Sequence, residues 1–267
     1  MGFRLRAGCA SETGPHRANN EDAAFTASSS SAIADGVGGG PAGELASSAL
    51  LHRLVATGAH PRSADAVRTL VRQSNWDLGW HSRRDPALTG LATTLTALFV
   101  DDDRVLLAHV GDSRAYRLQE GSFARMTRDD SYVQALVDAG LIDAVEAAAH
   151  PHRNVVTASL RGTAQDIDAL TVTEHEIMLG ERWLLCSDGV SDYLPDALLS
   201  DLLPVGAPEA AARTIVATAL SAGSRDNVTA LVCELVAPFA DPEHTRRRPE
   251  FFGAAAQLFA ETLDDTA

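Results

Sequence analysis

The sequence contains no lysine, because all 22 of its basic residues are arginine. This absence excludes mechanisms that need a lysine nucleophile or a Schiff base. Cysteine is also scarce, and the scattered positions of Cys9, Cys186 and Cys233 exclude a disulfide framework. Each cysteine lies in or beside an apolar stretch, so we expect buried thiols in a protein of the reducing cytoplasm.

Long hydrophobic runs and targeting signals are missing too. No stretch of about 18 uncharged apolar residues occurs, so no membrane span is expected. The first 14 residues lack the apolar region of a signal peptide, and Arg6 does not fit a myristoylation pattern. The net charge of −14 argues against nucleic acid and anionic membranes as primary partners. We therefore expect neither a nucleic-acid nor a membrane partner.

The chain has 267 residues, which allows one large domain or two small ones with a full core. Its composition shifts after Ala237, so we divide it into a main domain, 1–237, and a tail, 238–267. The tail is predicted to be a linker followed by a short amphipathic helix over 251–263. Such a tail either docks on its own domain or binds a partner, and the sequence leaves both open.

Hydrophobic periodicity divides the main domain into strands and helices. Helical spacing predicts helices over 43–57, 64–82 and 208–222. Residues 91–118 form three apolar strands with short turns, a meander that favours antiparallel sheet. Residues 128–160 change to short helices and turns, which indicates an insertion on the sheet scaffold.

Acidic residues stand at strand ends or in tight turns at five places. These are Glu21-Asp22, Asp35-Gly36, Asp112, Asp188 and Asp226. Buried carboxylates are costly unless they are paired or bind a metal, and an all-oxygen cluster selects hard cations such as Mg²⁺ or Mn²⁺. A single Asp-Gly turn has an ordinary alternative, since aspartate often only satisfies its own backbone. The hypothesis therefore depends on several of these acids meeting at one sheet edge.

Six segments together resemble the metal-dependent protein phosphatases of the PP2C (PPM) family, and the bacterial type most closely. They are RANNED at 17–22, DGVGG at 35–39, GLATTL at 90–95, AHVGDSRAY at 108–116, CSDGV at 186–190 and SRDNVT at 224–229. The resemblance covers about residues 6–235. It implies an α+β fold, a four-layer α-β-β-α sandwich of two antiparallel sheets flanked by helices. It also implies that 1–237 is the phosphatase domain and that 128–160 is a flap beside the active site, the alternative being a loop excursion without a role.

The resemblance also implies a site for two metal ions, Mn²⁺ or Mg²⁺. Asp35 would bridge the two ions, and the carbonyl of Gly36 would bind one of them. Asp188 and Asp226 would hold the other ion. The pair Glu21-Asp22 would lie around the second ion, partly through water.

The remaining implied roles concern the substrate and a third ion. Arg17 would bind the substrate phosphate, for which a bidentate guanidinium is well suited. Asp112, together with Asp188 and Asp192, would form the weaker third metal site of bacterial members. A hydroxide between the two main ions would attack phosphorus in line, without a covalent enzyme intermediate. The implied function is hydrolysis of phosphoserine and phosphothreonine on proteins by a monomer that opposes a bacterial Ser/Thr kinase and acts on its targets.

One position departs from the family pattern. Many bacterial relatives carry histidine after the Gly-Gly of the second motif, where this chain has Gly40. If that histidine protonates the leaving oxygen, another group or water must do so here. His16 is one candidate, and a solvated loop histidine is the ordinary alternative. Two rival functions also stay open: a catalytically weak regulator that binds phosphoproteins, and a small-molecule phosphomonoesterase on the same fold.

Overall fold

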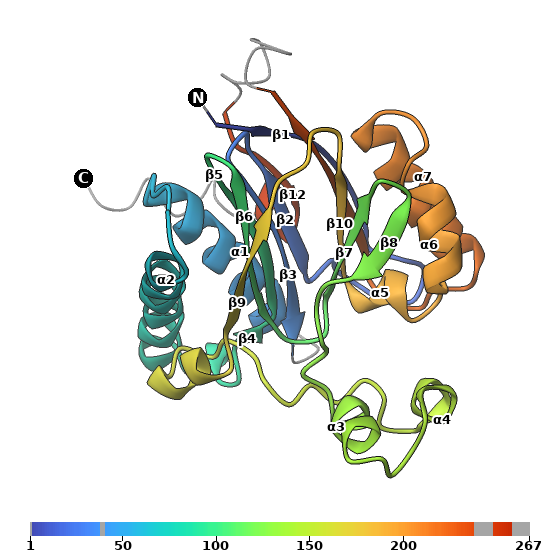
Figure 1. Cartoon of the computed structure of the whole chain (residues 1–267). Helices are drawn as coiled ribbons and strands as arrows, with labels where there is room; N and C mark the ends of the chain where they lie inside the picture. The colour runs from blue at the N-terminus through green and yellow to red at the C-terminus, as the bar shows by residue number, and fades with distance from the viewer. Residues whose placement is uncertain (1, 38–40, 238–247, 258–267) are drawn as a thin grey trace.

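The computed structural model describes residues 2–37, 41–237 and 248–257 (Figure 1). Its strands are β1 (Arg4–Glu12), β2 (Asp22–Thr26), β3 (Ser30–Val37), β4 (Ala92–Thr93), β5 (Leu95–Asp101), β6 (Arg104–Val110), β7 (Arg114–Gln119), β8 (Ser122–Arg125), β9 (Thr171–Glu176), β10 (Arg182–Cys186), β11 (Val228–Val236) and β12 (Glu250–Gly253). Its α-helices are α1 (Pro41–Ala56), α2 (Ala64–Arg84), α3 (Tyr132–Asp138), α4 (Ala144–Ala149), α5 (Asp188–Ser191), α6 (Asp196–Leu202), α7 (Pro208–Ser221) and α8 (Ala254–Gln257).

The described strands form two antiparallel sheets. One has the order β1-β11-β10-β7-β8, and the other has the order β12-β2-β3-β5-β6-β9, with β4 beside β3. Strands β5 and β6 pair as a hairpin, as the meander predicts, but β7 leaves them and pairs with β8 and β10 in the other sheet. The turn between β6 and β7 therefore connects the two sheets, and Asp112 lies in that turn.

The two sheets pack face to face between two layers of helices. Along β3, Ile33 faces the opposite sheet, whereas Ala32 and Ala34 face α1 and α2. Along β11, Leu231 lies between the sheets and Ala230 faces α7. Both faces of these strands are buried, which explains their nearly continuous apolar sequences. The expected four-layer α-β-β-α sandwich is confirmed (Figure 1).

Helix α2 shows how sequence determines the outer layer. Ser63 caps its first turn, and Val67 and Leu78 lie on its buried stripe. Its opposite face carries Trp76 and Trp80, which are largely exposed. Of the helices in the described ranges, none is long and apolar enough to cross a membrane.

The tail differs from the prediction. A helix was expected to begin at Phe251, but Glu250–Gly253 is strand β12, and the helix α8 begins only at Ala254. Phe251 packs with the residues under α1, whereas Phe252 packs between the sheets, which is the two-residue period of a strand. The open edge of β2 supplies the hydrogen-bond partners for this strand. The rest of the expected helix, 258–263, and the linker 238–247 lie outside the described residues.

Most of residues 128–160 form a separate lobe below the sandwich (Figure 1), and the segment returns to the core at Leu160, which pairs with Thr93. Ser131 caps α3 and Asp143 caps α4, so each short helix begins at a residue whose side chain accepts backbone N–H groups. The lobe joins the sandwich where N of Asp130 donates to the carbonyl of Gly111, while the carbonyl of Asp130 accepts from N of Thr157 within the lobe. The lobe is thus anchored beside the crossover turn.

Candidate active site

One cavity of about 140 Å³ gathers most of the predicted site residues at the end of the sandwich near the crossover turn. Five carboxylate residues from separate parts of the chain line it, together with an arginine, a glycine, two asparagines and two valines. The lining residues are Arg17, Glu21, Asp35, Gly36, Val37, Asp112, Asn154, Val156, Asp188, Asp226 and Asn227. Of the predicted metal ligands, Asp22 and Asp192 are not among the described residues that line this cavity.

Asp35 lies near the end of β3, and its backbone is fixed on both sides. Its N–H donates to Oγ1 of Thr94 at 2.9 Å, and its carbonyl accepts from Oγ1 of Thr93 at 3.0 Å and from N of Thr94 at 2.9 Å. Thr94 in turn contacts Oγ of Ser113 at 3.0 Å, next to Asp112. These hydroxyls therefore hold the Asp35 strand end against the crossover turn.

Gly36 is required by the close approach of α1. A Cβ atom at this position would lie 2.3 Å from the carbonyl oxygen of Gly43. A Cβ atom at Gly43 would in turn lie 2.8 Å from a carboxylate oxygen of Glu21. The backbone of Glu21 is held by N–H of Gly36 at 3.2 Å and by Oγ of Ser47 at 2.6 Å. The two glycines thus allow α1 to pack directly against the segment that carries Glu21.

Asp188 follows β10 in the opposite sheet, and the preceding residue links the two sheets. The Ser187 hydroxyl donates to Oδ2 of Asp22 at 2.7 Å and accepts from N of Thr229 at 3.1 Å. Asp22 is buried at 2% exposure and lies opposite Asp35 in the β2–β3 register. Asp22 is therefore placed behind the cavity wall as a bridge between the sheets.

Asp226 precedes β11, and its carboxylate forms an ion pair with Arg17. Nη2 of Arg17 donates to Oδ2 of Asp226 at 2.7 Å. Asn227 organises the same loop, because its Oδ1 accepts from N of Glu21 at 2.9 Å and its Nδ2 donates to the carbonyls of Thr13 and Asn19. No positioning role was predicted for Asn227; its place directly after a site aspartate was the available signal.

A turn with glycine at positive φ presents Asp112. Gly111 has a φ of +114°, a region that glycine adopts at little cost. Its N–H donates to Oδ2 of Asp130 at 2.9 Å, and its carbonyl accepts from N of Asp130 at 2.7 Å. The base of the 128–160 lobe therefore holds the turn that carries Asp112.

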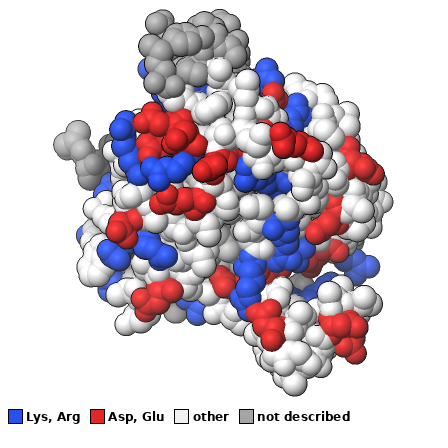
Figure 2. Space-filling view, viewed as in Figure 1, with Lys and Arg blue, Asp and Glu red and all other residues white. Residues whose placement is uncertain are grey.

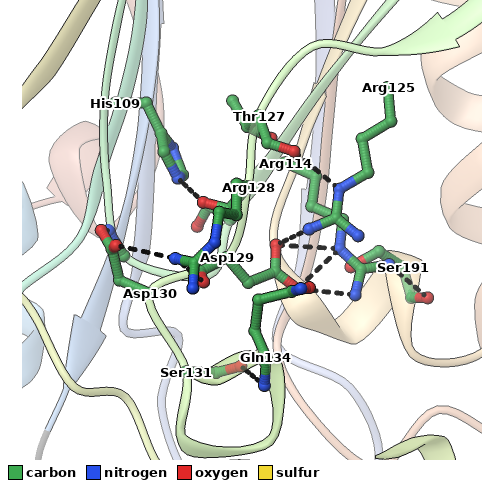
Figure 3. A network of polar contacts seen from close by, with 12 residues as sticks. His109, Arg114, Arg125, Thr127, Arg128, Asp129, Asp130, Ser131, Gln134 and Ser191 are labelled. Carbon is green, nitrogen blue, oxygen red and sulfur yellow. Dashed lines mark hydrogen bonds and ion pairs between the residues drawn. The ribbon is translucent and has the colours of Figure 1, made fainter. Parts of the chain in front are cut away.

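A cluster of ion pairs around Asp129 lies directly beside this turn (Figure 3). Asp129 accepts from Nη2 of Arg114 at 2.7 Å and pairs closely with Arg125. Nη1 of Arg114 also donates to the carbonyl of Ser191 at 3.4 Å, in the segment between Asp188 and Asp192. Asp129 is thus neutralised by arginines that reach both the crossover turn and α5.

His109 belongs to the wall behind this cluster rather than to the cavity. It is 3% exposed, and its ring nitrogens contact Oγ1 of Thr96 and the carbonyl of Arg128, each at 3.0 Å. Burial lowers the pKa of its imidazole, so the neutral form is favoured. His109 therefore acts as a buried structural hydrogen-bonding residue.

Three carboxylates of the cavity, Asp35, Asp112 and Asp188, have raised pKa values, as does Asp22 behind its wall. Removal from water is the first cause for Asp35 and Asp188, whose pKa values lie well above the usual range, and neighbouring carboxylates add to it. The pKa of Asp112 is raised to about 7, by burial and then by the charge of Asp129. Burial raises the pKa of Asp22 to about 6, against the opposing hydrogen bond from Ser187. Negative charge is therefore crowded here, and an added cation would be stabilised.

The residues present suit a hard cation. Carboxylate oxygens and a nearby backbone carbonyl are the donors that Mg²⁺ and Mn²⁺ prefer, and the lining of the cavity offers no thiolate or imidazole from the described residues. Within the described ranges, however, no three His, Cys, Asp or Glu side chains are already arranged to hold an ion. The pairs Asp226–Arg17 and Asp22–Ser187 are contacts that a bound cation would have to compete with.

A larger hollow of about 500 Å³ adjoins the acidic cavity and shares Asp112 and Asp188 with it. Its other walls come from α3, α4 and the segment after α5, and Figure 2 shows it as a recess between the lobe and the body of the molecule. Asp192 lines this hollow, 3.8 Å from Nε of Arg153. The predicted third-site residues are therefore brought together at the junction of the two cavities.

Two positions bear on protonation of the leaving group. Gly40 lies outside the described residues. His16 is exposed and is not among the described residues that line the acidic cavity. Asn154 lines that cavity from the base of the lobe, and no role was predicted for it.

Comparison with known proteins agrees with this geometry. A family model described as "Protein phosphatase 2C" matches residues 16–222. The chain belongs to the protein phosphatase 2C family. It is 36% identical over 255 residues to the serine/threonine protein phosphatase PstP of Mycobacterium tuberculosis. The aligned region covers 94% of this chain and 48% of PstP. The chain thus spans about half the length of that relative.

Solved structures share the fold. The crystal structure of the Mycobacterium tuberculosis phosphatase PstP/Ppp matches with a TM-score of 0.83 and 36% identity, over 88% of this chain and 100% of that one. A structure of the PstP catalytic domain in complex with two manganese ions matches with a TM-score of 0.80 and 34% identity, over the same shares. The two-sheet sandwich is therefore the fold of this phosphatase family.

Proposed function

We propose that this protein 2C family member hydrolyses phosphoserine and phosphothreonine on proteins with the help of divalent cations. The observation that carries the proposal is the single cavity in which Arg17 meets five carboxylate residues from separate segments. The names of its relatives, which are serine/threonine protein phosphatases, support the same reaction.

The ligand assignment follows the cavity lining. We assign Asp35, the Gly36 carbonyl, Asp188 and Asp226 to two Mn²⁺ or Mg²⁺ ions, with Glu21 at the same wall and Asp22 behind it. The solved PstP complex with two manganese ions supports this metal class. Bound cations would activate water for attack on phosphorus and offset the charge of the phosphate.

The chain's own residues have two further tasks in this proposal. Arg17 donates to the phosphate and keeps its contact with Asp226, so that substrate and ligand positions are linked. Asp112 and Asp192 face the junction with the larger hollow, where we assign a third and weaker cation site. The Asp35 backbone, fixed by Thr93 and Thr94, supplies the rigid support that such a site needs.

A protein substrate fits the surroundings better than a small phosphate ester does. The acidic cavity is small, but it opens beside the 500 Å³ hollow under α3 and α4. We propose that residues 128–160 act as the flap over this hollow and contact the peptide on either side of the phosphoresidue. Asn154 and Val156, which line the acidic cavity from the lobe, support this arrangement.

The test is hydrolysis of phosphoserine and phosphothreonine peptides in excess Mn²⁺, compared with p-nitrophenyl phosphate and a panel of metabolite phosphates. We expect phosphopeptides to have the highest kcat/KM, with no turnover in chelator. Preference for a metabolite would favour the small-molecule phosphomonoesterase. Phosphopeptide binding without turnover would favour the regulator, and absence of any hydrolysis in excess Mn²⁺ would contradict the enzyme proposal.

Three further predictions concern the setting of the protein. We propose that a Ser/Thr kinase and its targets are the partners, which dephosphorylation of an autophosphorylated kinase would test. We propose a monomer, which light scattering during size-exclusion chromatography would test. The cytoplasmic location stays a prediction; the three buried thiols are the feature that supports it.

A further inference from the structure

A second large groove lies between α1 and α2, in the outer helical layer. It has a volume of about 640 Å³, and its walls are largely apolar and aromatic. Trp76 and Trp80 line it while remaining 60% and 46% exposed. Exposed tryptophans beside a groove of this size are typical of a surface that binds another chain segment.

The groove borders the last described segment of the chain. Phe251 of β12 forms part of its wall and stacks on His52 of α1, with ring centroids 3.9 Å apart. Nε2 of His52 also contacts the carbonyl oxygen of Ala255 at 2.8 Å. Helix α8 is therefore held on α1, and at Gln257 the chain leaves the described structure next to the groove.

The sequence that follows matches the groove in polarity. Residues 258–267, LFAETLDDTA, carry three large apolar residues, Leu258, Phe259 and Leu263, and three acids, Glu261, Asp264 and Asp265. Basic side chains border the tryptophans, because Arg83 lies over the ring of Trp76 at 5.4 Å and Arg84 lies over that of Trp80 at 4.5 Å. Apolar residues would thus face the groove wall and acids would face the arginines.

We propose that residues 258–267 dock in the groove between α1 and α2. Leu258, Phe259 and Leu263 cover the exposed tryptophans, and Asp264 and Asp265 pair with Arg83 and Arg84. The segment forms a latch on the outer helical layer.

The tether favours this occupant over a second copy of the chain. Ten residues reach about 15 Å as a helix and about 33 Å when extended, so the segment can follow the groove from Gln257. A short tether also gives an effective concentration of about a millimolar, which a free second molecule does not reach in dilute solution. The latch is therefore intramolecular.

The latch connects to the active-site layer through α1. Its first turns contact the Glu21 segment, where Oγ of Ser47 donates to the Glu21 carbonyl at 2.6 Å. Its later turns carry Ala49, His52 and Arg53 into the groove wall. One helix thus carries both surfaces, although the docking proposal does not depend on the proposed function.

Contact quenching of a bimane label by tryptophan tests the proposal. Thr262→Cys places the label in the middle of the segment, and the native cysteines are buried and leave it as the accessible thiol. We expect Trp76→Phe with Trp80→Phe to raise the bimane emission at least about twofold, because quenching requires van der Waals contact. The same label at Ser122→Cys, on the β7–β8 hairpin across the molecule, is the matched control and should not respond (Figure 1).

The outcomes separate the possible occupants. Bimane emission that is equal with and without the two tryptophans would overturn the proposal. Quenching that grows with protein concentration would overturn it in favour of a second copy. Charge reversal at Arg83→Glu and Arg84→Glu should weaken quenching, and Asp264→Arg with Asp265→Arg should restore it. Quenching that survives the reversal at Arg83 and Arg84 would overturn the proposed orientation.

Discussion

Two groups of charged residues lie side by side in this molecule, and the negative charge of each is compensated in a different way. Asp129 is 6% exposed and is held by Arg114 and Arg125 (Figure 3). The carboxylates around Asp35 and Asp188 are also withdrawn from water, yet their main neighbours are other carboxylates, and burial and mutual repulsion raise their pKa values. The first group carries its own cations and stabilises the structure. The second group has too few positively charged side chains to balance its carboxylates, so we expect it to bind cations from solution.

The largest expected effect is on catalysis at the undercompensated group. Asp188→Asn should lower Mn²⁺-dependent hydrolysis of p-nitrophenyl phosphate by about a thousandfold or more, because it removes an anionic oxygen from the proposed ion site. The control is Asp201→Asn, an exposed acid on α6, which should retain full activity. Comparable activity in both variants would remove Asp188 from the site.

The next effect is on stability at the compensated group. Asp129→Ala should lower the free energy of unfolding by about 3–5 kcal/mol, because it leaves two largely buried arginines without their counterion. Urea denaturation followed by circular dichroism measures this change. The control is Arg213→Ala, which breaks the exposed Arg213–Glu209 pair on α7 and should cost at most about 1 kcal/mol. Equal losses of unfolding free energy in the two variants would mean that the ion pairs of Asp129 stabilise the fold no more than an exposed surface pair does.

Cation binding should stabilise the folded chain through the carboxylates of the acidic cavity and not through Asp129. Mn²⁺ at a hundred times its dissociation constant should add about 2.7 kcal/mol to the stability of the folded chain. Thermal melting in chelator and in Mn²⁺ measures this gain, which should vanish in Asp188→Asn. A gain of the same size in Asp188→Asn would place the bound ion elsewhere.

The smallest expected effect concerns Arg17, the positively charged side chain that lines the acidic cavity. Arg17→Lys should raise KM for a phosphopeptide about tenfold, since it removes one charge-assisted hydrogen bond worth about 1.5 kcal/mol or more. Steady-state kinetics should show a smaller change in kcat. An unchanged KM would mean that Arg17 serves only to hold Asp226.

The undercompensated group could be located from the sequence because its members lie at or beside strand ends. Asp35, Asp188 and Asp226 stand at boundaries that apolar strands make visible, and the family resemblance supplied the sandwich that brings them together. The compensated group was not predicted. Nothing in the spacing of Arg114, Arg125 and Asp129 indicates that the three side chains meet, since the meeting depends on how β7, β8 and the lobe pack.

The tail shows the same limit of local patterns. Phe251 and Phe252 fit an apolar helix stripe as well as a strand, and the choice is made by the open edge of β2, far away in the sequence. The placement of Asp192 in the neighbouring hollow likewise depends on how α5 is held by Arg114 at Ser191. Long-range pairing, rather than propensity, determined both results.

Anomalous diffraction at the manganese absorption edge, from crystals of the active protein grown with Mn²⁺, tests the central claim most directly. The account predicts strong anomalous peaks within the cavity lined by Asp35, Asp188 and Asp226, with none beside Asp129. A fully active crystal preparation whose manganese peaks lie only outside that cavity would contradict it.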